Sequence, residues 1–438
     1  MDKPNDRIYL HIDYEDAYVQ PLIIAAIRSR LPPELLVFIQ GKDLEQLPAN
    51  AKYLQWRQYE QIDFEHLLDN PSTSLANSYI IRKALIRKHY LSTTISHWLT
   101  KNPDSVLKDH VKPSVEFEVD YAEFLDDALI EAWELKESWA RDAAIDNEGE
   151  CEDGKEKEWW ILKPGMSERG QGIRLFSSEE ELTAIFEEWD PPSDDEDGDE
   201  DHEERTAHSG EGGGEDRVPK PTDHEDEGNN GIMTSQLRHF IAQPYIHPPL
   251  LLPSPHPSAD RKFHIRTYVV AAGALKVYVY QPMLALFAGK DYTSPGSATG
   301  EREGSVDAFW DLPSTLPNLN TAENTSDWRQ DVFEQICAAT GETFEAAART
   351  MSIHFQPLPN SFEIFGLDFL VDAQGTAWLL EVNAFPDFKQ TGDELSGLVE
   401  GLFEGVVDVA VRPFFGVDGV KQDSTEMIKV LDIDLGRR

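Results

Sequence analysis

The sequence predicts a mixed α/β (α+β) fold with a small N-terminal α/β unit and a larger C-terminal unit. Residues 8–12, 17–30 and 35–40 have the patterns of a strand, an amphipathic helix and a second strand, which favours a parallel strand pair. Residues 365–372 and 377–383 are apolar, β-prone runs joined by turn residues, which predicts a hairpin. A chain of 438 residues is long enough for about two or three such units.

The chain divides into four expected parts. We expect an N-terminal domain over residues 1–74, a central segment over 75–157, a C-terminal domain over 158–416 and a tail over 417–438. Residues 190–231 form an acidic insert, because positions 190–228 alone hold 17 acidic and 3 basic residues. This insert has few large apolar side chains to offset the entropy of ordering, so we expect it to be disordered and dispensable for stability.

Charge and cysteine content restrict the class of protein. The formal net charge is −42, with 81 acidic and 39 basic residues, which argues against nucleic acid as a ligand. No apolar run of about 18 residues and no signal peptide is present, so we expect neither membrane insertion nor export. The only cysteines, Cys151 and Cys337, lack metal-site or redox spacing. A cytoplasmic protein is therefore expected, with a nuclear location left open.

Three polar residues interrupt the apolar C-terminal hairpin. Glu381 and Asn383 are two positions apart, so they project from one face of their strand, and Asp368 can reach that face from the paired strand. Two carboxylates and an amide oxygen are hard ligands that suit Mg²⁺. The alternative is an edge hairpin with a solvated polar face. The apolar residues around these three positions favour the metal site.

A lysine and a glycine loop follow an apolar strand in the middle of the chain. Lys163 ends the run Trp159-Trp160-Ile161-Leu162, which places a cation on a buried strand. The glycines that follow allow a backbone to approach a phosphate closely, and they are Gly165, Gly170 and Gly172. An ordinary hairpin turn is the alternative for this loop.

Two further basic segments stand out in an acidic chain. Lys262, His264 and Arg266 alternate with apolar residues, so they share one strand face. Residues 82–89 form the only dense basic cluster, on a helix expected over residues 75–99. A solvated edge strand and a solvated helix face are the alternatives.

A lysine before a glycine loop, a basic strand and an acidic hairpin together suit a Mg²⁺-bound nucleoside triphosphate. A protein kinase would need His-Arg-Asp and Asp-Phe-Gly motifs, and neither is present. The P-loop motif is also absent. The ATP-grasp arrangement, in which two sheets clamp ATP, remains, and residues 158–416 are its expected location.

Several short motifs occur in a specific order over roughly residues 75–415. They are Arg82-Lys83-Ala84, Trp160-Ile161-Leu162-Lys163, Gly170-Gln171-Gly172-Ile173, Gln243-Pro244-Tyr245-Ile246, Pro249-Leu250-Leu251, Arg261-Lys262-Phe263-x-Ile265-Arg266, Phe362-Glu363-Ile364-Phe365-Gly366-x-Asp368-Phe369 and Leu380-Glu381-Val382-Asn383-x-x-Pro386. In this ordered set the chain resembles the tubulin–tyrosine ligase family of the ATP-grasp superfamily.

The resemblance implies a role for each matched position. Lys83 and Lys163 would hold phosphates of ATP, covered by the loop that contains Gly170 and Gly172. Gln243 and Tyr245 would lie at the adenine hinge, and Ile161, Leu370 and Leu380 would pack on the base. Lys262 and Arg266 would neutralise charge on the nucleotide and on the reacting carboxylate, and Asp368, Glu381 and Asn383 would bind Mg²⁺.

The implied activity is ATP- and Mg²⁺-dependent ligation of an amino acid, tyrosine or glutamate, to a protein carboxylate through an acyl phosphate. The implied acceptor is a tubulin tail, with another protein or peptide as the alternative. Two positions depart from the family pattern: His264 replaces an acidic residue, and Gln281 replaces an arginine near the γ-phosphate, for which Lys290 is a possible substitute. A nucleotide-binding scaffold without turnover is therefore the second alternative.

Overall fold

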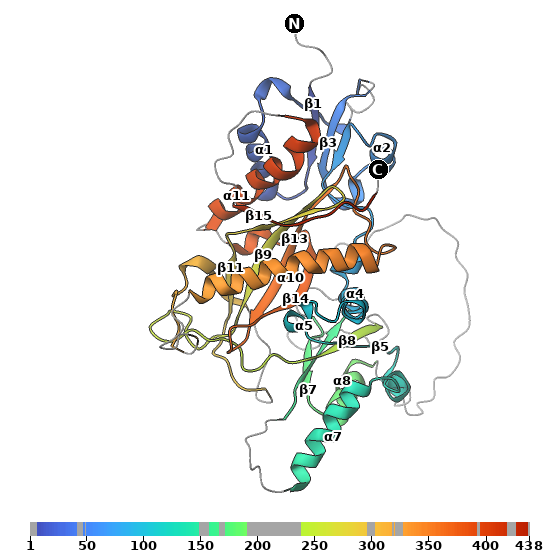
Figure 1. The fold of residues 1–438 in the computed structure, drawn as a ribbon, viewed down its shortest axis with the longest axis vertical. Helices are drawn as coiled ribbons and strands as arrows, with labels where there is room; N and C mark the ends of the chain where they lie inside the picture. Colours follow the sequence, from blue (N-terminus) through green and yellow to red (C-terminus); the bar gives the residue numbers. More distant parts are fainter. Residues whose placement is uncertain are drawn as a thin grey trace, which may run out of the picture.

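The computed structural model describes residues 7–41, 47–48, 50–148, 157–165, 171–190, 238–295, 303–317, 319, 327–391, 395–417 and 426–436. Three sheets follow one another along the long axis of the molecule (Figure 1). The N-terminal sheet lies at one end and the four-stranded sheet β5-β8-β6-β7 at the other. The predicted acidic insert 190–231 lies outside the described residues except for Asp190.

The N-terminal sheet confirms the predicted strand–helix–strand unit. Its parallel strands have the order β2-β1-β3-β4. Their bounds, and those of the two helices in this unit, are β1 Ile8–Asp13, β2 Leu36–Phe38, β3 Lys52–Arg57, β4 Ser74–Ala76, α1 Val19–Arg30 and α2 Phe64–Asp69. The strands β3 and β4 were not predicted, and β4 spans the boundary expected after residue 74.

The central segment is less helical than its pattern indicates. The helix expected over residues 75–99 is instead β4 followed by two helices, which begin at Lys83 and at Lys88. The helices of this part are α3 Lys83–Ile86, α4 Lys88–Lys101, α5 Leu107–His110, α6 Leu125–Ala128 and α7 Trp133–Glu148.

The four-stranded sheet is antiparallel, with the order β5-β8-β6-β7. Its strands and the helix α8 are β5 Val115–Glu118, β6 Trp160–Pro164, β7 Arg174–Phe176, β8 His239–Pro244 and α8 Glu179–Trp189. Trp160, Leu162 and Phe240 pack in one core with α8. Because side chains alternate along a strand, Ile161, Lys163 and Gln243 project from the other face.

The seven-stranded sheet has the path β12-β11-β9-β10-β15, with β13 paired to β9 and β14 paired to β13. Its strands are β9 Phe263–Ala272, β10 Lys276–Tyr280, β11 Leu284–Ala288, β12 Glu303–Ala308, β13 Phe362–Val371, β14 Ala377–Ala384 and β15 Met427–Asp432. The helices beside it are α10 Trp328–Thr350, α11 Ser396–Val406 and α12 Arg412–Phe415. The strand β12 was not predicted, and the tail expected over residues 417–438 supplies β15.

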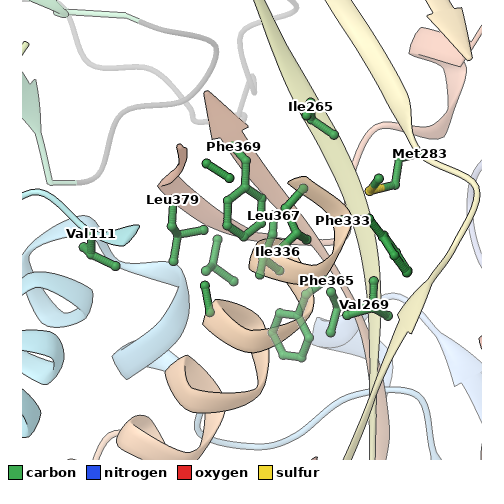
Figure 2. Close-up of a cluster of buried hydrophobic side chains, with 14 of the residues drawn as sticks. Val111, Ile265, Val269, Met283, Phe333, Ile336, Phe365, Leu367, Phe369 and Leu379 are labelled. Carbon is green, nitrogen blue, oxygen red and sulfur yellow. The ribbon is translucent and has the colours of Figure 1, made fainter. Parts of the chain in front are cut away.

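One face of β9 and β13 lies against α10. Ile265, Phe365, Leu367 and Phe369 belong to a buried cluster that also contains Ile336 of α10 (Figure 2). The alternate residues of β13 project from the opposite face. The first of them pack in a second core, which is shared with the N-terminal unit and α11. Further along, this face carries Asp368 and Leu370. The hydrophobic pattern therefore fixes which face of β13 carries polar groups.

Within the described segments, none of the helices combines the length and the apolar character needed to span a bilayer.

Candidate functional site

The hairpin of β13 and β14 brings the three predicted metal ligands together. Asp368 and Glu381 are register partners on the two strands. The Asn383 Nδ2 donates to Glu381 Oε1 at 2.9 Å and to Asp368 Oδ2 at 3.3 Å. The predicted shared face is therefore confirmed.

A β-bulge sets the direction of Glu381. Phe369 is paired with Leu379, while the preceding Asp368 is paired with Glu381, so Leu380 is an extra residue on β14. The bulge keeps Leu379 in the core with Phe369 while Glu381 faces the same side as Asp368. Strict alternation along β14 would have put Leu379 and Glu381 on one face.

Each carboxylate of the hairpin is paired with a cation. The Arg266 Nε donates to Asp368 Oδ1 at 2.6 Å and its Nη2 donates to Oδ2 at 3.2 Å, in a buried bidentate pair. Burial disfavours the Arg266 guanidinium, but Asp368 outweighs it and raises the pKa of Arg266. Lys88 Nζ lies 3.0 Å from Glu381 Oε2. Burial alone would raise the pKa of Glu381, but Lys88, Asn383 and Lys163 lower it to about 2.

Lys163 reaches the same place from the four-stranded sheet. Its side chain is buried, and its Nζ donates to Gln243 Oε1 at 2.8 Å. Burial lowers the pKa of Lys163 to about 8, Glu381 opposes this shift, and Lys88 and Lys262 reinforce it. Lys163 is therefore coupled electrostatically to Glu381 of the hairpin, and its phosphate-binding role remains a prediction.

Gln243 and Tyr245, the predicted hinge residues, contact the two lysines. The Gln243 Nε2 donates to Ser114 Oγ at 2.8 Å, which fixes the amide that accepts from Lys163. Lys262 Nζ donates to the Tyr245 hydroxyl at 3.1 Å and lies 4.9 Å from the centre of the ring. These contacts connect β8 of one sheet to the segment preceding β9 of the other.

The residues predicted to pack on the base come from both sheets. Ile161 is half-buried and shares its strand face with Lys163. Leu370 is buried and shares its face with Asp368, and Leu380 is half-buried at the bulge. Their role as an adenine pocket remains a prediction.

The start of the glycine loop is tightly packed. The Gly165 N–H donates to the His239 carbonyl oxygen at 2.7 Å. A Cβ atom at Gly165 would lie 2.6 Å from His89 Nδ1, so a larger residue would displace this imidazole. Gly172 has a φ of +74°, in the region that favours glycine. Gly170 lies outside the described residues.

The basic cluster 82–89 is divided among three roles. Arg82 Nε lies 2.8 Å from Glu363 Oε1 in a buried ion pair, which is structural. Lys88, which we did not predict, meets Glu381. Lys83 is exposed, and among the described residues no side-chain hydrogen bond or ion pair joins it to the cluster. The signal for Lys88 was its place in the only dense basic run.

The two positions that depart from the family pattern differ in their surroundings. His264 Nε2 lies 4.0 Å from Asp368 Oδ1, so His264 belongs to the site. The backbone N–H of Gln281 donates to the Glu426 carbonyl oxygen at 2.8 Å, next to β15. Lys290, the suggested substitute for the lost cation, is exposed.

The cluster is positively charged although the chain is strongly acidic. Four cations, Lys88, Lys163, Lys262 and Arg266, surround the carboxylates of Asp368 and Glu381, which leaves a local charge of +2 in a chain of −42. A site of this charge between two sheets suits a polyphosphate.

The donor set also fits Mg²⁺. Mg²⁺ is commonly bound through one or two carboxylates together with substrate phosphates. Asp368 and Glu381 supply these carboxylates, and Asn383 supplies an amide. Throughout the described ranges there is no group of three or more His, Cys, Asp or Glu residues suited to a metal ion, so phosphate oxygens would have to complete the coordination.

Comparisons with known proteins give matches over most of the chain. The profile of the tubulin-tyrosine ligase family matches residues 68–418. The chain is 42% identical over 431 residues to a probable tubulin–tyrosine ligase of Schizosaccharomyces pombe, which covers 95% of this chain and 94% of the relative. It is 38% identical over 458 residues to the probable tubulin–tyrosine ligase PBY1 of Saccharomyces cerevisiae, covering 99% of this chain and 56% of that relative. The chain thus spans little more than half of the second relative.

A solved structure shares the fold. The C-terminal domain of Pby1 from K. lactis is 35% identical and superposes with a TM-score of 0.67, covering 98% of this chain and 99% of that one. That protein is described as an ATP-grasp enzyme that interacts with the mRNA decapping enzyme Dcp2. The predicted ATP-grasp fold is therefore confirmed.

Proposed function

This chain belongs to the tubulin–tyrosine ligase family, and we propose that it is an ATP- and Mg²⁺-dependent ligase that joins an amino acid to a protein carboxylate. One observation carries the proposal. Lys88, Lys163, Lys262 and Arg266 gather around two carboxylates between the two sheets of an ATP-grasp fold. The amino acid that we propose is tyrosine or glutamate.

The proposed chemistry has two steps. An oxygen of the acceptor carboxylate attacks the γ-phosphorus of ATP and ADP leaves, which gives an acyl phosphate. The amine of the amino acid then attacks the acyl carbon, phosphate leaves and the nitrogen loses a proton. Both steps build negative charge on oxygen atoms, so they need positioned cations rather than a protein nucleophile.

Residues of this chain can supply those cations. Lys163 and Lys262 would hold phosphates, and Lys88 would join them once it leaves Glu381. Arg266 would stay paired with Asp368, because the bidentate contact is buried, and would act on the reacting carboxylate from there. Mg²⁺ held by Asp368, Glu381 and Asn383 would neutralise charge on the phosphates.

Tubulin is the acceptor that the names of the two yeast relatives support. The alternative is the same chemistry on another protein, which gains support from the relative that interacts with Dcp2. A second candidate function is a nucleotide-binding scaffold without turnover. It is favoured by His264, an imidazole 4.0 Å from Asp368 where the family has an acidic residue.

Calorimetric titration with ATP and Mg²⁺ is the first test. We expect binding by the native chain and loss of about tenfold or more in affinity for Lys163→Ala, because a buried cation is removed from the phosphates. Lys101→Ala is the matched control, since Lys101 is exposed at the far end of α4. Equal affinities for the native chain and Lys163→Ala would contradict the proposed site.

Incubation with labelled tyrosine or glutamate then separates the functions. ATP-dependent incorporation into purified tubulin supports the first acceptor, and incorporation into Dcp2 but not tubulin supports the alternative. Nucleotide binding without incorporation or ATP consumption with either acceptor supports the scaffold. Absence of nucleotide binding contradicts both the ligase and the nucleotide-binding scaffold.

A further inference from the structure

Large apolar side chains are exposed together on one short stretch of the central segment. Tyr121, Phe124, Ile130 and Trp133 are 43%, 47%, 57% and 66% exposed. The described residues contain nine exposed large hydrophobic side chains, and these four lie within positions 121–133. Such a concentration is unusual for a surface that meets only water.

These side chains are not needed for the fold. The same stretch buries Leu125, Leu129 and Leu135 in the core beneath the four-stranded sheet. Tyr121 and Phe124 pack edge to face, with ring centres 6.3 Å apart. Trp133 begins α7, and this residue is 66% exposed. The inward residues hold the segment in place while the outward residues have no role in the core.

Exposed acidic residues are interspersed with the exposed apolar residues along this stretch, and we call them the acidic rim. Six exposed acidic residues lie between positions 121 and 137, and they are Glu123, Asp126, Asp127, Glu131, Glu134 and Glu137. The one basic residue in this stretch, Lys136, has its Nζ 3.5 Å from the Ile130 carbonyl oxygen. The surface therefore combines apolar anchors with strong negative charge. We call residues 121–137 the Trp133 surface.

We propose that the Trp133 surface docks a basic, amphipathic segment of another protein. Charge complementarity selects this occupant, because lysine or arginine would meet the rim while apolar side chains cover the exposed rings. A second copy of the chain would bring the same acidic rim and be repelled. The insert 190–231 is itself acidic, so it is also unsuited to this surface.

The proposed docking surface and the nucleotide site lie on opposite sides of one sheet. Leu125, Leu129 and Leu135 pack in the core with Trp160 and Leu162, whereas Lys163 projects from the other face of β6. In Figure 1, α7 lies at the end of the molecule opposite to the N-terminal sheet. A docked segment would leave the nucleotide site open, so the proposal is independent of the ligase activity.

Fluorescence anisotropy with a designed peptide tests the proposal. The probe is a labelled amphipathic helical peptide with leucine on one face and lysine on the other. The comparison peptide carries glutamate in place of lysine. We expect the lysine probe to bind the full chain, and Ile130→Ser with Trp133→Ser to weaken binding about tenfold or more, as expected for loss of an aromatic anchor. Ile353→Ser is the matched control, because Ile353 is 74% exposed elsewhere.

A charge variant separates docking from general attraction to an acidic protein. Glu131→Gln with Glu134→Gln should weaken the lysine probe by about threefold to tenfold, and equal changes at Glu345 and Glu400 should weaken it less. Equal losses of probe affinity from the two charge pairs would overturn the proposal, as would equal losses from the serine variants and from Ile353→Ser. Tighter binding of the glutamate peptide than of the lysine probe would also overturn it. So would tighter binding of the protein to anionic lipid vesicles than to the lysine probe. An unchanged melting temperature shows that each variant is folded.

Discussion

Glu381 is the residue on which the charge balance of the site depends. It accepts from Asn383, lies 3.0 Å from Lys88 and faces Asp368 across the hairpin. Glu381→Gln keeps the shape and removes one negative charge. We expect the free energy of unfolding to fall by about 1–3 kcal/mol while the protein stays folded, because the Lys88 side chain is only 13% exposed and loses its counter-charge.

The same substitution should abolish Mg²⁺-dependent turnover. Binding of ATP without metal should fall far less, since Lys88, Lys163 and Lys262 remain. Calorimetry and ATP consumption measure the two effects, and Glu400→Gln, on the exposed side of α11, is the control. A folded Glu381→Gln protein with native Mg²⁺-dependent activity would refute the metal site.

Lys163 gives the site a dependence on pH. Burial lowers its pKa to about 8 in the free protein, so at pH 8 about half of the molecules carry the ammonium. Phosphates of ATP would favour the charged form and raise this pKa, so binding at pH 8 should take up about half a proton. Calorimetry in buffers of different ionisation enthalpy measures the uptake.

The sign of this effect is fixed by the lowered pKa of Lys163. The uptake should decline below pH 7, where the free lysine is already protonated, and affinity for ATP should decrease as the pH rises above 8. Lys163→Arg stays charged, so its uptake should vanish. Proton release at pH 8 would show that ATP does not meet Lys163.

At the scale of elements, the close contact of β13 with β9 and with the segment after β14 depends on Gly366. A Cβ atom there would lie 2.8 Å from the Cβ of Pro386 and 3.3 Å from the Cδ of Arg266. We expect Gly366→Ala to lower the free energy of unfolding by about 1–3 kcal/mol, because the added methyl group overpacks this contact. Denaturant unfolding measures the loss.

The control for Gly366→Ala is Gly397→Ala. Gly397 lies in α11 and no atom lies within 4 Å of its added Cβ, so alanine should stabilise the protein by about 0.5–1 kcal/mol. ATP affinity should fall in Gly366→Ala alone, since the methyl group displaces Arg266. A destabilisation shared by both variants would mean that the Pro386 contact is not the cause.

The elements that the sequence predicts are those whose signal is local. The hairpin 365–372 with 377–383 follows from alternation and turn residues, and the structure extends it by only a few positions as β13 and β14. The strand β15 was missed because it is held by pairing with β10, a strand far away in the sequence. Such pairings leave no period in the short strand itself.

The same distinction applies to the site. Arg266 and Asp368 lie on the regular strands β9 and β13, so alternation predicts their faces, whereas the direction of Glu381 depends on the bulge at Leu380. Lys88 depends on the break at Arg87 between α3 and α4, which turns the chain toward the hairpin. No spacing rule predicts this change of direction, so the sequence did not single out Lys88, and the phosphate-binding role of Lys83 remains a prediction.

At the scale of the whole molecule, the net charge of −42 opposes the compact state. Raising NaCl from about 0.01 to 0.15 M shortens the screening length from about 30 to 8 Å. We expect the melting temperature to rise by about 2 °C or more, because repulsion among exposed carboxylates weakens more than the buried Arg266–Asp368 pair. Chloride is preferred to phosphate, which would bind the site. A melting temperature that falls with NaCl would show that attractive surface pairs dominate.

The Lys88–Glu381 pair has a consequence for discrimination between ligands. A phosphate ion that binds Lys88 alone leaves Glu381 without a counter-charge. A divalent cation that binds Glu381 alone leaves Lys88 without one. Only a ligand that carries both a cation and an anion can replace both partners at once. If the proposed site is right, metal and nucleotide would therefore favour each other's binding, and abundant free anions would compete poorly.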